Sequence, residues 1–321
     1  MRVTSRSQQG ICSIFIVICS MTILAKAAGD SGRLLASSKE TEKPIHEMSW
    51  GDFNRTYIIE NTGDKCRYSS KDFKPSTQNI EMLLPFEVDW VKMGAVPPVK
   101  NQGKCQASWV FSAVSAIEAH SSIVSGEPIR LFSNQQVLDC MGSSNRMNCS
   151  AGTPGKAYDF LQRQGGLALR YLYRDKPMTP QIISGFTVCK YDVTQSGVQV
   201  GSGSKDLKPY DENALIQALL TIGPITVLMD GRGLKDYRGG IWDGNYTDWS
   251  GNKVNCSNDQ EDLNHVALLV AVEWDKSGKQ YYTLQNSWGE EWGENGYFRL
   301  YREPNICGIS LCASYPRLMP Y

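Results

Sequence analysis

The pattern that most constrains this chain is a stretch of apolar residues at helical spacing. From Ser108 to Ser125 apolar side chains recur along one helical face, and Gly126 follows as a stop signal. The apolar positions are Val110, Phe111, Val114, Ile117 and Ile123. The pattern predicts one long helix that is mostly buried.

Later segments indicate how the rest of the chain is organised. A second helical stretch follows Asp211 and ends at Gly223-Pro224. Residues 266–272 and 281–284 have the composition of strands. Helices therefore come first and strands last, which predicts an α+β fold of two halves. We find no internal repeat and no second hydrophobic run long enough to cross a bilayer.

The N-terminus has the form of a secretory signal peptide. Arg2 and Arg6 precede an apolar run over residues 11–24, and residues 25–27 read Ala-Lys-Ala, a small-residue cleavage site. About 14 apolar residues fall short of the roughly 20 that a membrane anchor needs. We therefore interpret residues 1–27 as a signal peptide. Acceptor sequons for glycosylation agree with secretory passage and lie at Asn54, Asn148, Asn245 and Asn255.

The charge balance excludes partners that bind through a strong net charge. Lysine and arginine total 33, and aspartate and glutamate also total 33. No excess positive charge is left to attract a phosphate backbone or an anionic membrane surface. We therefore expect no nucleic-acid partner and a soluble monomer after signal cleavage.

Three separated motifs carry the chemistry. Residues 102–109 read QGKCQASW at the start of the long helix, residues 264–267 read NHVA, and residues 286–297 read NSWGEEWGENGY. In this order they resemble the active-site segments of papain-like cysteine peptidases of the cathepsin L type. The resemblance covers residues 84–321. It implies a helical half (84–211), an antiparallel, barrel-like half (212–321) and an active-site cleft between them.

The resemblance also implies a role for each site residue. His265 would act as base and acid, Asn286 would orient its ring, Trp288 would shield their hydrogen bond, and Gln102 would donate to the oxyanion. Where the family has its nucleophilic cysteine, this chain has Ser108, as silicateins do. A hydroxyl does not ionise near neutral pH, so it cannot form the resting ion pair with an imidazolium. We therefore expect much reduced peptidase turnover.

Simpler roles for these residues stay open. A serine that opens a helix is usually a cap, because its hydroxyl accepts an N–H of the first turn. A histidine in an apolar run is ordinarily a core residue, but the flanking residues of His265 favour the active site. Trp292 is better described as a core aromatic. Gln106 stands where the family usually has glycine, and we expect its long side chain to crowd substrate.

Eight cysteines remain after signal cleavage, in an oxidising compartment. Taken alone they permit 105 connectivities. Their spacing does not suit zinc, and we expect no metal and no cofactor. The pairs that the resemblance implies are Cys105–Cys149, Cys140–Cys189 and Cys256–Cys307. Cys66 and Cys312 are left over.

The resemblance places a peptide-binding cleft beside the catalytic residues. Cys312 would form the floor of the pocket that selects the second residue of the substrate. We expect it to be a free thiol in the mature protein, and the alternative is a bridge to Cys66 that ties the prosegment across the cleft. The substrate-binding residues implied are Gly152, Thr153, Pro154, Leu263 and Cys312.

Residues 28–83 are interpreted as a shortened inhibitory prosegment. Residues 48–53, MSWGDF, look like the end of such a segment, whereas the long helical part that usually precedes it is missing. We expect either that the gene model is truncated or that this brake on activity has eroded.

Two classes of function follow. The first is a secreted or lysosomal/vacuolar homologue of cysteine peptidases that binds an extended peptide or protein in its cleft with little hydrolysis. The second is a serine-dependent hydrolase or condensing enzyme of the silicatein type, with residual endopeptidase activity in protein breakdown as a further alternative. Gln106 and Trp109 depart from the silicatein pattern and favour the first class.

Overall fold

The computed structural model describes residues 43–59, 66, 68, 87–141, 149, 152–178 and 187–319. Residues 43–321 form one compact unit, and the predicted signal peptide lies outside the described residues. In the part that is described, no helix is long and apolar enough to cross a membrane. The α-helices are α1 (Trp50–Tyr57), α2 (Ser108–Ser125), α3 (Asn134–Met141), α4 (Pro154–Gln164) and α6 (Glu212–Thr221).

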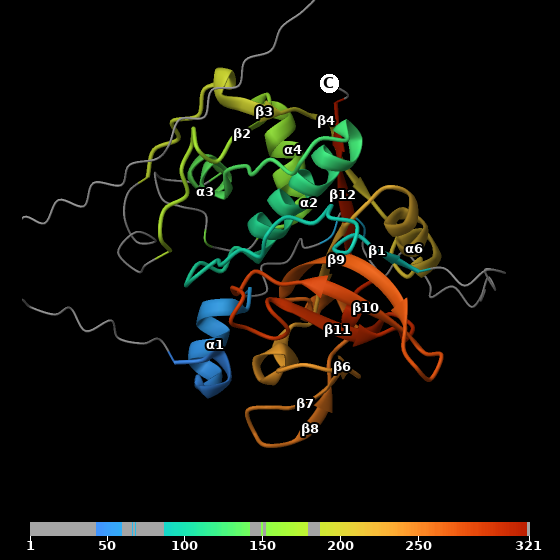
Figure 1. Cartoon of the computed structure of the whole chain (residues 1–321). Coiled ribbons are helices and arrows are strands. Elements are labelled where there is room, and N and C mark those ends of the chain that lie inside the picture. Colours follow the sequence, from blue (N-terminus) through green and yellow to red (C-terminus); the bar gives the residue numbers. More distant parts are fainter. Residues whose placement is uncertain are drawn as a thin grey trace, which may run out of the picture. The chain divides into compact units, whose positions relative to one another are not determined.

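The strands belong mostly to the second half of the chain (Figure 1). They are β1 (Val88–Asp89), β2 (Leu167–Ala168), β3 (Ser196–Val198), β4 (Val200–Asp206), β5 (Ile225–Met229), β6 (Ile241–Trp242), β7 (Asn245–Thr247), β8 (Lys253–Asn255), β9 (His265–Trp274), β10 (Gln280–Gln285), β11 (Tyr297–Tyr301) and β12 (Ala313–Leu318). Helices first and strands last is the order that the sequence predicts.

The predicted long helix is confirmed at both ends. α2 runs from Ser108 to Ser125 and ends at Gly126, whose φ of 69° is left-handed and suits glycine. Residues 108–121 of this helix are all buried. The shorter α4 packs beside it, and the Thr153 hydroxyl begins α4 by accepting a hydrogen bond from the backbone of Lys156.

The main sheet has eight strands among the described residues, in the order β4-β12-β5-β9-β10-β11-β6 with β1 beside β9. Its pairs are antiparallel except for β6, which runs parallel to β11. The papain-like α+β fold is therefore confirmed, and its sheet is mixed rather than purely antiparallel. The chain crosses from β6 through the β7–β8 hairpin and two further strands, β9 and β10, before it returns as β11 beside β6.

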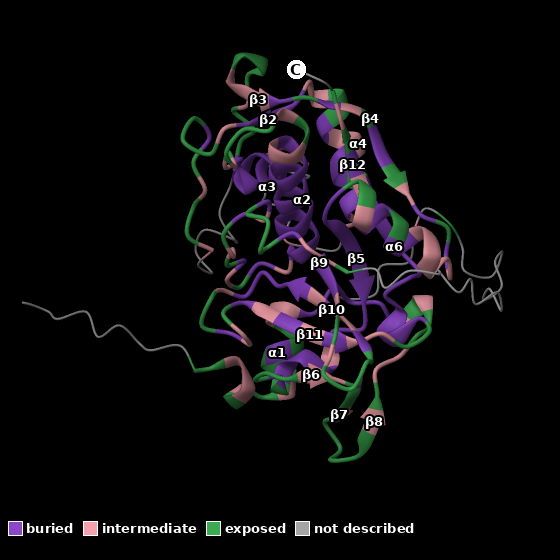
Figure 2. Cartoon of the chain, turned by 45° about the vertical axis from the view of Figure 1, so that its right-hand side comes forward, coloured by how far each residue is buried: buried purple, intermediate pink, exposed green. Residues whose placement is uncertain are grey.

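Strand β9 separates two hydrophobic cores. Successive side chains of a strand point to opposite faces. On one face, Val266 and Leu268 join the helical core, which includes Trp109, Ile117, Leu138, Tyr158 and Leu161. On the other face, Ala267 and Leu269 join the sheet core, which includes Val227, Tyr282, Leu284, Trp288 and Phe298. Both α2 and β9 are buried along most of their lengths (Figure 2).

Three disulfides tie loops to this framework. The structure joins Cys105 to Cys149, Cys140 to Cys189 and Cys256 to Cys307. These are the three pairs that the resemblance implies. Each closes a loop of roughly similar length, with sequence separations of 44, 49 and 51.

A buried histidine makes the stability of the fold sensitive to acid. The His120 ring of α2 is 3% exposed, and its Nε2 donates a hydrogen bond of 2.7 Å to the carbonyl oxygen of Pro224. Burial lowers the pKa of His120 to about 4, against the smaller opposing effect of that hydrogen bond. The unfolded chain therefore takes up this proton at a higher pH than the folded protein does.

We expect the free energy of unfolding to fall as the pH drops from about 6.5 to about 4. His120 contributes up to about 3 kcal/mol of this loss, because its folded pKa lies well below the unfolded value. His120→Gln keeps a side-chain N–H for Pro224 and removes the titration. Denaturant unfolding at several pH values should show a flatter profile for this variant than for the wild type. Identical profiles would contradict the assignment.

Candidate active site

The N-terminus of α2 places Ser108 at the boundary between the two cores. Its side chain is fully buried, and its Oγ accepts a hydrogen bond of 3.2 Å from the backbone N–H of Val266 in β9. One turn later, Ser112 donates to the carbonyl oxygen of Val266 at 3.2 Å. The capping interpretation is wrong, because the N-cap is Ala107 and Ser108 is already the first helical residue. The Ser108 hydroxyl therefore helps to hold α2 against β9.

His265 is the first residue of β9, and its imidazole is held between two neighbours. Nε2 donates to Asn286 Oδ1 at 2.9 Å, and the same oxygen accepts from the backbone N–H of Ser287 at 2.7 Å. The Trp288 ring lies 4.7 Å from the imidazole, measured between centroids. The other ring nitrogen, Nδ1, has no hydrogen-bond partner among the described residues. The structure thus brings together three of the residues that the sequence assigns to the site.

Burial controls the charge of this imidazole. It lowers the pKa of His265 to about 4, while the hydrogen bond to Asn286 acts in the opposite direction. The ring is therefore neutral above about pH 5, with a proton on Nε2. A neutral imidazole can accept a proton at Nδ1, but it is not one half of a resting ion pair.

The predicted oxyanion donor, Gln102, is fixed by the loop that carries Asn286. Its backbone N–H donates to the carbonyl oxygen of Ser287 at 2.8 Å, and its Oε1 accepts from Ser287 Oγ at 2.7 Å. Its Nε2 donates to the carbonyl oxygen of Cys105 at 2.8 Å. One of the two amide hydrogens of Gln102 is thus already engaged by the turn that leads into α2.

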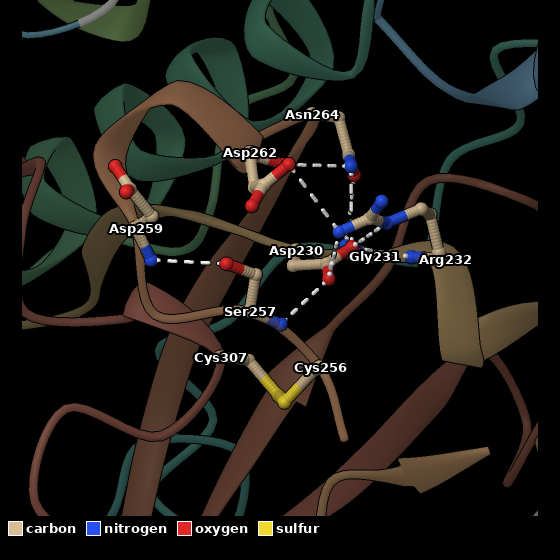
Figure 3. A network of polar contacts seen from close by, with 9 residues as sticks. All are labelled: Asp230, Gly231, Arg232, Cys256, Ser257, Asp259, Asp262, Asn264 and Cys307. Atoms are coloured by element: carbon tan, nitrogen blue, oxygen red, sulfur yellow. Dashed lines mark hydrogen bonds and ion pairs between the residues drawn. A yellow bond between two sulfur atoms is a disulfide. The ribbon is translucent and has the colours of Figure 1, made fainter. Parts of the chain in front are cut away.

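The sequence analysis missed a polar network around Asp230, Arg232 and Asn264, the residue that precedes His265 in the chain (Figure 3). The fully buried carboxylate of Asp230 accepts two hydrogen bonds of 2.8 Å from the Arg232 side chain and one of 3.1 Å from Asn264 Nδ2. Asn264 Oδ1 in turn accepts from the backbone N–H of Gly231 at 2.9 Å. A Cβ at Gly231 would lie 2.5 Å from His265 Cβ, so only glycine permits this approach. The one sequence feature that could have revealed this network is the position of Asn264 next to His265.

The predicted peptide-binding residues divide into two groups. Thr153, Pro154 and Cys312 line a cavity of about 290 Å³ that Leu228 of β5 also borders. Gly152 and Leu263 are not among its lining residues. Gly152 lies against the Trp109 ring so closely that a Cβ would come within 2.4 Å of it, and Leu263 is fully buried in the helical core.

The expectation of a free thiol at Cys312 is wrong for the chain as described. Cys312 is bonded to Cys66, and their Cα atoms are 5.3 Å apart, within the separation that a disulfide spans. Cys66 lies in the segment interpreted as prosegment and lines the same cavity. The alternative, a bridge from that segment into the pocket, is therefore what the structure contains.

The short helix α1 covers the site from outside. The Phe53 and Tyr57 rings lie 5.6 and 5.0 Å from the Trp288 ring. Two residues past the helix, the backbone N–H of Ile59 donates to the carbonyl oxygen of Asn264 at 2.8 Å. Residues 53–59 thus contact the Trp288 ring and the residue next to His265.

Gln106 contacts α1 through its side-chain amide, and its crowding of substrate stays a prediction. Its Nε2 donates to the backbone carbonyl oxygens of Asn54 at 3.1 Å and Arg55 at 2.8 Å. Both carbonyls belong to the last turn of α1, and that of Asn54 also accepts a hydrogen bond of 3.2 Å from the backbone N–H of Ile58. The long side chain of Gln106, which glycine could not replace, therefore holds the end of α1 in place.

Three of the four predicted sequons are in described parts of the chain. Asn54, Asn245 and Asn255 are exposed, whereas Asn148 lies outside the described residues. Asn245 and Asn255 face each other across the β7–β8 hairpin. Within the described residues, no group of three or more His, Cys, Asp or Glu side chains is arranged to hold a metal ion.

We expect Gln106→Gly and Gln106→Glu to loosen α1. Each removes two hydrogen bonds worth about 0.5–1.5 kcal/mol apiece, and glutamate has the same shape as glutamine but no N–H to donate. Hydrogen exchange measured by mass spectrometry should accelerate about tenfold or more in residues 50–59. Exchange in α4 should stay as in the wild type. Unchanged exchange in α1 would show that Gln106 does not hold it.

Comparisons with known proteins agree with this geometry. Cysteine proteinase 3 of Solanum lycopersicum is 32% identical over 271 residues, which span 84% of this chain and 69% of that protein. Cathepsin 7 of Rattus norvegicus is 35% identical over 291 residues, or 85% of this chain and 82% of that protein.

Solved structures show the same likeness. The digestive procathepsin L 3 of the Tenebrio molitor larval midgut matches with a TM-score of 0.65 and 31% identity, over 84% of this chain and 80% of that chain. The bromelain protease of Ananas comosus, solved in complex with the E64 inhibitor, matches with a TM-score of 0.61 and 30% identity, over 74% and 100%. The family model described as papain family cysteine protease matches residues 84–317. The chain therefore belongs to the papain family of cysteine proteases.

Proposed function

We propose that this protein is a papain-family homologue in which Ser108 takes the place of the nucleophilic cysteine. In this proposal proteolysis is much reduced, and the cleft serves to bind an extended peptide or protein segment. Residues 84–321 form the family domain, and residues 28–83 form the shortened prosegment that precedes it.

The hydrogen bond that Ser108 Oγ accepts from Val266 is the main support for this proposal. A serine nucleophile must pass its proton to a base, so the two need a hydrogen bond. Here Ser108 Oγ accepts from the N–H of Val266, while His265 Nδ1 has no hydrogen-bond partner among the described residues. The rest of the site is in place, because Asn286 and Trp288 hold the ring. The arrangement supports a site that keeps its framework without an activated nucleophile.

The chain itself supports the binding role. Ile59 pairs through its backbone N–H with the carbonyl oxygen of Asn264 at 2.8 Å. Ile58 belongs to the sheet core and Ile59 to the helical core, so this short segment lies along the boundary between them. Main-chain pairing of this kind holds an extended peptide without regard to most of its side chains.

A serine-dependent hydrolase or condensing enzyme of the silicatein type is the second candidate. The neutral state of His265 favours it, since a base that takes a proton from serine must be uncharged. It requires the Ser108 hydroxyl to rotate away from Val266 toward Nδ1.

We further propose passage through the secretory pathway to the cell exterior or to a lysosome or vacuole. The predicted signal peptide at residues 1–27 supports it. So do the disulfides, because such bonds persist in oxidising compartments. The exposed sequon residues Asn54, Asn245 and Asn255 are available for glycosylation there.

We expect Ser108→Cys to gain peptidase activity. A thiol ionises where a hydroxyl does not, and the residues that orient His265 are already in place. On fluorogenic peptides, assayed after removal of residues 28–83 under reducing conditions, the rate should exceed that of wild type by at least about a hundredfold.

Ser108→Ala is the matched control, because it removes the hydroxyl and adds no nucleophile. Wild type and Ser108→Ala should be about equally slow. Rapid cleavage by the wild type that Ser108→Ala abolishes would overturn the proposal and establish the serine-dependent enzyme.

The pH profile separates the two candidates further. If Ser108 acts, His265 must be neutral to take its proton. The rate should therefore rise as the pH increases through the pKa of the ring, and it should not decrease between that pKa and neutral pH. Steady-state rates of wild type and Ser108→Ala between pH 4 and 8 test this. A wild-type profile that peaks near pH 5 is incompatible with serine acting through a neutral base.

A further inference from the structure

A covalent bond joins the segment interpreted as prosegment to the cavity that Thr153 and Pro154 line. Cys66 and Cys312 are 246 positions apart in the sequence, yet their Cα atoms lie 5.3 Å apart. Cys312 directly precedes β12, the strand that pairs with β4 and β5. The bridge therefore anchors the prosegment to the main sheet and not to a surface loop.

The bridge lies at the pocket where a substrate side chain would enter. Cys66, Tyr68 and Cys312 line the cavity of about 290 Å³ together with Thr153 and Pro154 at the start of α4. A ligand side chain that enters this cavity must share it with the bridge and with Tyr68. The bridge thus occupies the space that would select a substrate.

Two further contacts fix the same segment upstream. Ile59 bonds to the backbone of Asn264 beside His265, and its side chain is only 5% exposed. Gln106 holds the last turn of α1 through two backbone carbonyls. The prosegment is therefore held at three places: at α1 by Gln106, at Ile59 by Asn264, and at Cys66 by the bridge to Cys312.

We propose that the Cys66–Cys312 bridge retains the prosegment in the cleft after the chain is cut, so that the cleft opens only when a thiol reductant cleaves the bridge. This inference rests on the proposed binding role of the cleft. A cut between residues 66 and 84 would release an ordinary prosegment. In this chain the N-terminal piece stays attached through Cys312.

The opening step is a thiol–disulfide exchange with a small thiol or a dithiol protein as reductant. A reductant thiolate attacks one sulfur of the bridge, forms a mixed disulfide with it, and releases the other sulfur as a thiolate that takes up a proton. A second reductant thiol resolves the mixed disulfide. Cys66 and Cys312 end as thiols, and two reductant thiols end as one disulfide.

Retention matters because a tethered segment competes at a high effective concentration. A segment held next to its site acts at about millimolar concentration, and an external peptide must outcompete it. Cutting the backbone alone leaves this tether in place. Only the cut and the reduction together turn the segment into a dissociable ligand.

The first test is peptide mapping of the wild-type chain without reductant. A fragment in which Cys66 is linked to Cys312 is expected, and neither cysteine should be alkylated. Alkylation of both residues in the folded, unreduced protein would overturn the inference. This readout does not depend on catalysis, so it holds whether or not Ser108→Cys gains activity.

The second test separates the two tethers. A recognition sequence for a sequence-specific protease is placed at positions 76–79, between Cys66 and the family match that begins at residue 84. The probe is a fluorescent peptide with the sequence of residues 49–59, and its binding is followed by anisotropy. Protein that is cut and reduced should bind it at least about tenfold more tightly than protein that is only cut or only reduced.

Cys66→Ser supplies the matched control. It removes the tether without altering the sheet, so cutting alone should open the cleft in this variant. Cys140→Ser/Cys189→Ser removes a disulfide elsewhere and should still require reduction after the cut. If the wild type binds the probe equally well after the cut with and without reductant, the bridge does not gate the cleft and the inference fails.

Discussion

The contact between the start of α2 and the start of β9 is the interaction on which the rest of this structure depends. Ser108 and Ser112, one turn apart, bracket Val266 by bonding to its N–H and its carbonyl oxygen. Because β9 also separates the two cores, this contact sets where helices and sheet meet. His265 stands one residue before Val266, so its position follows directly. A buried polar contact thus fixes both the fold and the site.

The sequence predicts those parts of the fold that depend on local patterns. The ends of α2 follow from apolar periodicity and from Gly126, and both are found where expected. The parallel pairing of β6 with β11 joins segments that no local pattern relates. The role of Ser108 cannot be predicted either. A serine that opens a helix is normally a cap, whereas Ser108 accepts a hydrogen bond from Val266, which is distant in the sequence and adjacent in the fold.

The same division holds for the site. His265, Asn286 and Trp288 can be named from motifs, and the structure brings them together. The Asp230 network cannot be named, since its members are ordinary polar residues until the fold brings Gly231 against His265. Gln106 departs from the glycine that is usual in the family, but its partners are backbone carbonyls of a segment about fifty residues earlier. Sequence identifies the unusual residue, and only the fold supplies its partner.

The Cys66–Cys312 bridge also determines how this molecule would carry mechanical tension. A pull on the two ends of the chain passes from residue 66 straight to residue 312 through a covalent bond. The chain between them, with most of both cores, forms a closed loop that bears none of the load. Among the described elements, α1, the short 3-10 helix of residues 45–47 before it, and β12 lie outside that loop and are in the line of force. Under tension α1 and β12 would detach or unfold first, while the framework around His265 kept its shape.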